Sequence, residues 1–135
     1  MSANMMANGD IRPARFVKIS ADHKVQECDA NDRIFGVAQD GGNKAPIPET
    51  TTILAGEDGQ NMAIWQEGEE CLLEVGAAVT QNDRLKADAD GKGVAIATTG
   101  TTIQHFGAVA LQDGAADATL IRVRVQIGSE RPALT

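Results

Sequence analysis

The sequence of 135 residues is poor in aromatic side chains, with one Trp, three Phe and no Tyr. A core must therefore be built from Val, Ile, Leu and Ala, which bury less apolar area per residue than aromatic rings do. A small domain with such a core gains stability when it buries further surface against a partner. The composition favours a protein that self-associates or binds a large surface.

The sequence also lacks clustered basic residues and long apolar runs. It carries 12 Lys and Arg against 19 Asp and Glu, a formal net charge of −7. Because nucleic acids and anionic membranes attract basic surfaces, we expect no direct nucleic-acid or membrane binding. No run approaches the roughly 20 apolar residues of a membrane-spanning helix, and residues 1–10 lack the apolar segment of a secretory signal. We expect a chain made in a cytoplasm.

Residues for catalysis or metal binding are few. Two cysteines, Cys28 and Cys71, and two histidines, His23 and His105, are scattered without the spacing of a four-ligand zinc site. Reduced thiols are expected over one disulfide in a chain that is not secreted. Acidic neighbours of Cys28 raise a thiol pKa, and no serine lies in a nucleophile elbow. We expect no enzyme activity, no metal and no cofactor.

What the sequence does contain is a regular alternation of turn signals and short strand-like segments, about one turn every ten residues. This rhythm is typical of an all-β fold, here a small single-domain sandwich or barrel of short strands and hairpins. An Asp-Gly turn at 90–91 predicts the clearest hairpin. The segments expected to form strands are 16–20, 25–28, 34–39, 50–54, 62–65, 71–75, 84–87, 93–97, 106–111 and 121–127.

The segment 121–127 alternates strictly between apolar and polar residues. That period of two predicts a half-buried strand that turns Ile121 and Ile127 to the core and Arg122 and Arg124 outward. With the preceding run at 106–111 it forms a strand–turn–strand unit.

An internal echo links two distant segments. Residues 34–41 read IFGVAQDG, and residues 106–114 read FGAVALQDG, so Phe35 and Phe106 stand 71 residues apart. This period is too long for a solenoid repeat. One interpretation is a pair of related sheet segments in a pseudo-symmetric core, and the alternative is chance similarity between two strands rich in Gly, Ala and Val.

We expect a flexible N-terminal arm at 1–15, a β domain at 16–128 and a polar C-terminal tail at 129–135. Two cations, Arg12 and Arg15, stand beside Phe16 at the end of the arm. The segment 11–16 is interpreted as an attachment point that lies along a neighbouring subunit, with Phe16 in a pocket. The alternative is an ordinary disordered terminus.

The order of these segments resembles the small capsid cement or head decoration proteins of tailed bacteriophages. The matching stretches are the Gly-Val-Ala strand at 36–38, the hairpin region 79–93 and the closing unit 106–125, within a resemblance that covers about 16–127. The chain departs from the pattern at 81–83, where Gln-Asn-Asp replaces a common Gly-Asp. The resemblance implies an all-β domain without catalysis that forms homotrimers or other small oligomers. It also implies a virion protein on the outer capsid surface that binds the major capsid protein.

The expected contacts with a capsid or with another subunit are made by residues of the arm junction, the Trp and the outward face of the last strand. These residues are Ile11, Arg12, Arg15, Phe16, Trp65, Arg122 and Arg124. Trp65 can serve as a core residue or as an interface anchor, and the core is favoured. Two other functions stay open, a small oligomeric β-barrel enzyme and a carbohydrate- or receptor-binding module on a virion.

Overall fold

The computed structural model describes residues 3–21, 24–38, 59, 61–96, 103–117 and 119–130. These residues form ten strands and no helix, so the predicted all-β class is confirmed, and they include no helix able to cross a membrane. The expected strand at 50–54 lies outside the described residues. The ten strands are β1 (Ala3–Ala7), β2 (Phe16–Ala21), β3 (Lys24–Glu27), β4 (Gly36–Ala38), β5 (Asn61–Trp65), β6 (Glu70–Val75), β7 (Arg84–Ala87), β8 (Gly93–Ala95), β9 (Gln104–Ala110) and β10 (Thr119–Glu130).

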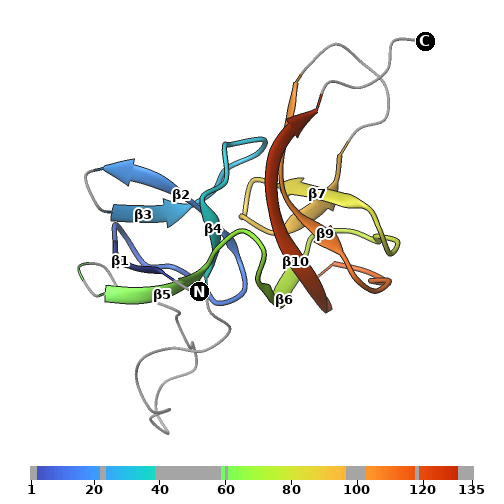
Figure 1. The fold of residues 1–135 in the computed structure, drawn as a ribbon, viewed down its shortest axis with the longest axis horizontal. Coiled ribbons are helices and arrows are strands. Elements are labelled where there is room, and N and C mark those ends of the chain that lie inside the picture. Colours follow the sequence, from blue (N-terminus) through green and yellow to red (C-terminus); the bar gives the residue numbers. More distant parts are fainter. Residues whose placement is uncertain are drawn as a thin grey trace, which may run out of the picture.

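The strands close into two five-stranded barrels that lie side by side (Figure 1). Barrel 1 has the strand order β1-β3-β2-β4-β5, and barrel 2 has the order β6-β8-β7-β9-β10. In each barrel the first strand pairs in parallel with the third and antiparallel with the fifth. Because closure pairs the two edges of a sheet with each other, the described strands leave no open edge in either barrel.

The two barrels are tandem repeats with the same topology and register. In the β2–β3 hairpin Val17 pairs with Glu27, and in the β7–β8 hairpin Leu85 pairs with Ala95. Each residue of the first pair lies 68 positions before its counterpart in the second pair (17 to 85 and 27 to 95). The parallel pairs of the two barrels show the same displacement.

The connection from the first to the second strand repeats as well. Ile11 and Val79, again 68 residues apart, each form an isolated bridge and are buried. Ala14 and Asn82 both adopt a positive φ, of 57° and 74°. Since a positive φ is uncommon for residues other than glycine, its recurrence at the same position supports a true structural repeat.

The echo seen in the sequence falls on equivalent strands of the two barrels. Phe35 immediately precedes β4, and Phe106 lies in β9, the fourth strand of barrel 2. The pairing of β9 with β7 shifts register at this point, so that Gly107 is passed over between Phe106 and Ala108. The interpretation of two related sheet segments is therefore confirmed, although they lie in separate barrels and do not pair with each other.

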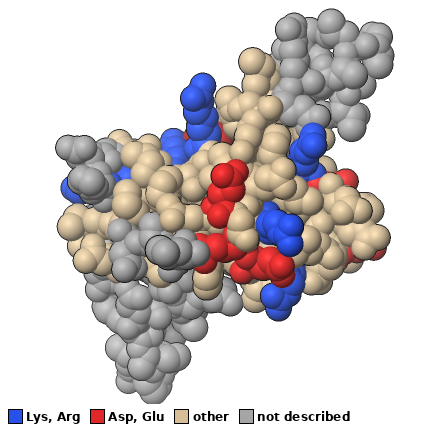
Figure 2. Space-filling view, in the orientation of Figure 1, with Lys and Arg blue, Asp and Glu red and all other residues tan. Residues whose placement is uncertain are grey.

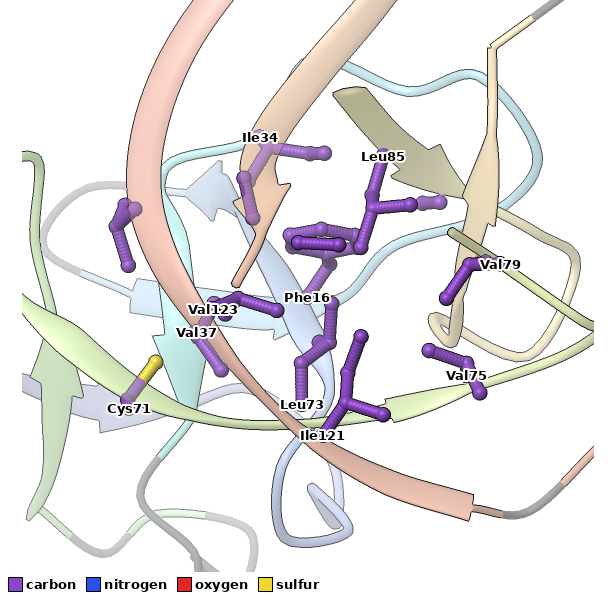
Figure 3. Close-up of a cluster of buried hydrophobic side chains, with 14 of the residues drawn as sticks. Phe16, Ile34, Val37, Cys71, Leu73, Val75, Val79, Leu85, Ile121 and Val123 are labelled. Carbon is purple, nitrogen blue, oxygen red and sulfur yellow. The ribbon is translucent and has the colours of Figure 1, made fainter. Parts of the chain in front are cut away.

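Each barrel has an aliphatic interior, and equivalent positions fill both. The interior of barrel 1 consists of Ala7, Ile11, Val17, Val25, Ala38, Met62 and Ile64. The corresponding positions of barrel 2 are Val75, Val79, Leu85, Gly93, Ala110, Ile121 and Val123. The core of barrel 2 also extends into barrel 1, because Phe16, Ile34 and Val37 pack against it (Figure 3).

The seam between the barrels is also held by backbone hydrogen bonds. The N–H of Phe16 donates to the carbonyl of Gly91 at 2.8 Å, and the N–H of Glu74 donates to the carbonyl of Ala14 at 2.9 Å. Gly91 has a φ of +77°, and a Cβ there would stand 3.3 Å from the Phe16 carbonyl oxygen. A glycine at this turn permits both the backbone conformation and the close approach of the barrels.

Two expectations about chain organisation differ from the structure. The expectation of a flexible arm at 1–15 was wrong for residues 3–15, because β1 completes barrel 1 by pairing with β3 and β5. A short strand such as β1 has no apolar periodicity, and its partners lie far along the chain, so the sequence gives no local signal from which to predict it. The region expected to be one β domain also divides between two barrels, and β10 extends to Glu130 into the expected tail.

The predicted alternation of β10 holds only in part. Ile121, Val123 and Val125 are fully buried and Arg122 and Arg124 are exposed, as expected. Ile127 was expected in the core and is instead exposed, because the pairing of β10 with β9 shifts register between Val125 and Gly128. A shift of one residue turns the following side chains to the other face of a strand.

Candidate interaction surfaces

The described residues contain no group of three or more His, Cys, Asp or Glu side chains placed to hold a metal ion. His105 lies with its Nδ1 atom 2.7 Å from Ser129 Oγ, and His23 lies outside the described residues. Cys28 and Cys71 are buried and are not joined in a disulfide. Burial, and then the charge of Asp32, raise the pKa of the Cys28 thiol to about 12. A thiol with this pKa is a poor nucleophile at neutral pH.

The two arginines of the predicted attachment point are bound within the chain. Arg15 is buried, and its guanidinium donates to the Glu74 carboxylate at 3.0 Å and to the Asp90 carbonyl at 2.9 Å, both across the seam. The guanidinium of Arg12 makes a two-pronged contact with the Glu27 carboxylate, with bonds of 3.0 and 2.8 Å, and this hydrogen bonding raises the Arg12 pKa. Both cations therefore stabilise the seam and its edge.

Ile11 and Phe16 are fully buried in the interior of the molecule. Ile11 belongs to the core of barrel 1, and the ring of Phe16 lies beside Leu85 and Leu73 of barrel 2 (Figure 3). Neither side chain has surface left to contact another molecule, so the expectation of Phe16 in a pocket of a neighbouring subunit is replaced by a pocket within its own chain.

The remaining predicted contact residues lie at or near the surface. Arg122 and Arg124 project from β10, and Arg124 stands 3.5 Å from the carboxylate of Glu70. Trp65 is partly buried at the end of β5 and packs against the core of barrel 2. On the face shown in Figure 2, acidic side chains gather near the middle of the molecule with basic side chains next to them.

A shallow hollow of about 200 Å³ lies where β10 changes register. It is lined by Arg33, Ile34, His105, Ile127, Gly128 and Ser129. Its apolar and cationic lining differs from the acidic character of the whole chain. The sequence did not single out this hollow, because it forms only where the β3–β4 connection meets the end of β10.

Six large apolar side chains are exposed on the described surface. They are Met6, Ile19, Ile103, Leu111, Leu120 and Ile127. None was among the predicted contact residues. Met6 was assigned to the arm, Ile19 to the strand at 16–20, and Ile127 to the inward face of the last strand, from which the register shift removes it.

Comparison with known proteins gives a likeness of fold. No protein-family model matches the sequence, and no curated protein matches it. A solved structure with a similar fold is the crystal structure of the head fiber gp8.5 N base in bacteriophage phi29. The two chains share 12% identity with a TM-score of 0.53, and the match covers 93% of each. The likeness therefore concerns the fold and extends over almost the whole of both chains.

Proposed function

We propose that this chain is a non-enzymatic structural protein of a bacteriophage head that binds the outside of the shell. The observation that carries the proposal is the fold shared with a head fiber base over 93% of both chains. The sequence motifs that resemble head decoration proteins support the same assignment independently. A shared fold does not by itself imply a shared function, so these motifs are needed alongside it.

In the finer form of the proposal, the protein cements joints between major capsid subunits and acts there as a homotrimer. Arg122 and Arg124 on β10 supply exposed cationic contacts, and Trp65 borders the same region at the junction of the barrels. Arg15 and Phe16 act indirectly, because they hold the two barrels in one arrangement, and Ile11 acts indirectly by filling the interior of barrel 1. A rigid two-barrel body suits a contact that resists outward pressure on the shell.

The alternative of a carbohydrate-binding module is disfavoured by the aromatic residues, all four of which are described. Phe16 and Phe106 are buried, and Phe35 and Trp65 are partly buried. Sugar-binding surfaces stack sugar rings on exposed aromatic faces, and here no such platform is present among the four. The buried thiol of Cys28, with its raised pKa, also supports a role other than nucleophilic catalysis.

The proposal is tested by adding the purified protein to phage heads that lack it. Electron cryomicroscopy should show density at fixed positions on the outer surface, and the temperature at which the heads release DNA should rise. The variant with Arg122→Glu and Arg124→Glu should bind more weakly, while Gln126→Glu on the same strand should bind normally. Absence of bound density at saturating protein would overturn head attachment, and binding without a rise in release temperature would overturn cementing.

A further inference from the structure

The outer side of barrel 2 is a continuous sheet surface in which β10 lies between β6 and β9 (Figure 1). Arg122 on β10 lies opposite Leu72 of β6. On its other side, the N–H of Leu111 donates to the Arg122 carbonyl at 3.0 Å. Leu120 is the neighbouring outward residue on β10, because outward residues of a strand stand two positions apart. Since opposite residues of paired strands have Cβ atoms about 5 Å apart, these leucines surround one arginine.

The next row of the same surface carries two more arginines. Arg124 of β10 lies opposite Glu70 on one side and opposite Val109 of β9 on the other. Val109 lies in turn opposite Arg84 of β7, whose guanidinium stands 5.3 Å from the centroid of the Phe106 ring. We call this surface the arginine–leucine face, and it consists of Leu72, Arg84, Val109, Leu111, Leu120, Arg122 and Arg124.

The arginine–leucine face is open to solvent. Leu111 and Leu120 are 38% and 48% exposed, and they are two of the six large apolar side chains exposed among the described residues. The three arginines of the face are exposed as well. Arg124 stands 3.5 Å from the carboxylate of Glu70, whereas no described residue forms an ion pair with Arg122. Apolar side chains that adjoin an exposed cation in this way mark a contact surface more strongly than apolar side chains scattered singly.

The charge of the face narrows the class of partner. The whole chain has a formal net charge of −7, so a DNA duplex would be repelled by the rest of the molecule, and its phosphates would leave the leucines uncovered. A second copy that presented the same face would bring like charges together. A protein surface with carboxylates between apolar side chains satisfies both parts of the face. A guanidinium binds a carboxylate through two parallel hydrogen bonds, and the leucines become buried.

We propose that the arginine–leucine face docks on a protein surface on which Asp or Glu carboxylates stand between apolar side chains. Arg122 binds a carboxylate at the centre of this contact, and the surrounding leucines exclude water and so strengthen the ion pair. In the proposed function the docking surface belongs to the major capsid protein. The inference therefore rests on head attachment, and it adds the apolar part of the contact and the acidic character of the partner.

The test is the affinity of the full chain and its variants for phage heads that lack the protein, measured by cosedimentation. Arg122→Glu and Leu111→Asp should each weaken binding about tenfold or more. Arg122→Lys keeps the charge but loses the two-pronged geometry, so it should weaken binding to a smaller extent. The melting temperature of each variant reports whether it is folded, and Leu120→Asp serves as a second apolar variant if Leu111→Asp is unstable.

Barrel 1 offers matched controls. Lys24→Glu makes the same change of charge as Arg122→Glu at an exposed position, and Ile19→Asp replaces an apolar residue that is 49% exposed. Both residues lie outside the arginine–leucine face, and both variants should bind heads as the wild type does. Equal losses of binding in these controls would show that the face has no special role and would overturn the inference.

Cross-linking identifies the chemistry of the partner. Because Cys28 and Cys71 are buried, the variant Leu111→Cys presents a thiol that a maleimide carrying a photoreactive benzophenone labels selectively. Illumination on heads should link this position to a shell peptide that contains Asp or Glu beside apolar residues. The same label on Ile19→Cys should give no such product. A cross-linked peptide that is basic would contradict the proposed partner.

The outcomes separate this inference from head attachment itself. Failure of the wild type to bind heads would overturn both. Normal binding by the wild type, Arg122→Glu and Leu111→Asp would overturn the inference alone. If these variants change the sedimentation of the isolated protein but not head binding, the face joins copies of this chain. If the wild type binds a DNA duplex and Arg122→Glu does not, the face contacts phosphates. Either result contradicts the inference.

Discussion

At the scale of single residues, the two barrels show how one backbone accommodates different interiors. Val25 lies in the core of barrel 1, and the equivalent residue of barrel 2 is Gly93. A Cβ at Gly93 would stand 2.6 Å from a methyl carbon of Leu73, so the Leu73 side chain occupies the space that a larger residue at 93 would need. Leu85 is likewise larger than its counterpart Val17. Different residues therefore fill equivalent positions of the two interiors, because close packing constrains the space that is filled more than the identity of each residue.

Arg15 shows the limit of judging a charged residue from its neighbours in sequence. Arginine is seldom fully buried unless it is paired, so an exposed contact role was the natural expectation. In the fold, Glu74 and the carbonyl of Asp90 meet its guanidinium from 59 and 75 residues away. A buried arginine with these partners stabilises one arrangement of the barrels, and removing the Glu74 carboxylate would leave the charge of Arg15 uncompensated.

The thiol of Cys28 leads to a prediction about pH. The pKa of this group is about 12 in the fold against 9.0 for an ordinary thiol, mainly because of burial. The raised pKa means that the folded protein favours the protonated thiol. The contribution of this thiol to stability is therefore present below pH 9 and is lost as the pH rises toward 12. The free energy of unfolding should fall over this range by up to about 4 kcal/mol.

Urea unfolding measured from pH 8 to pH 11 checks this expectation. Cys28→Ala removes the titrating group, so the free energy of unfolding should fall less steeply with pH than in the wild type, although the variant is less stable at pH 8. An equally steep decline in both proteins would assign the pH dependence to other groups. Rapid reaction of native Cys28 with a thiol reagent at pH 8 would contradict the raised pKa directly.

At the scale of elements, β1 is the strand whose role changed most between sequence and structure. Its five residues pair with β3 on one side and with β5 on the other, which closes barrel 1. Deletion of residues 1–10 should therefore open the barrel and expose two strand edges, together with the apolar interior that Ala7 helps to cover.

The expected result of this deletion is a loss of several kcal/mol of stability and a tendency to aggregate. Circular dichroism and size-exclusion chromatography measure both effects. Deletion of residues 131–135 is the control at the other terminus. If the N-terminal deletion folds with unchanged stability and loses only head binding, then β1 is an attachment arm and its place in the barrel is not essential.

At the scale of the whole molecule, one hydrophobic cluster crosses the seam. Phe16, Ile34 and Val37 of barrel 1 belong to the same cluster as the interior of barrel 2. A shared core couples the unfolding of the two barrels, so we expect one cooperative transition in calorimetry. Phe16→Ala should lower the free energy of unfolding by about 3–5 kcal/mol and should still show one transition.

Met62→Ala is a suitable comparison, because Met62 is buried in the interior of barrel 1 alone. It should destabilise the protein by about 2–5 kcal/mol. Two separate transitions in the wild type would show that the barrels fold independently and that the seam contributes little. A Phe16→Ala variant that splits one transition into two would instead identify this side chain as the main coupling between the barrels.

The sequence by itself determined the fold class, the hairpin at 84–95 and the inward face of β10 as far as Val125. Each of these depends on local information, namely turn residues and a period of two. The sequence also contained a trace of the repeat, because the Phe-Gly pairs at 35–36 and 106–107 mark equivalent strands.

Only the tertiary structure decided that two closed barrels form, that β1 belongs to one of them, and that Arg15 and Phe16 are internal. Barrel closure depends on pairing between segments such as β1 and β5, which lie more than 50 residues apart. The side chains of a short strand carry little evidence of so distant a partner. Likewise, the exposure of Ile127 is decided by the register shift between Val125 and Gly128, since exposure is a property of the packed molecule and not of the residues themselves.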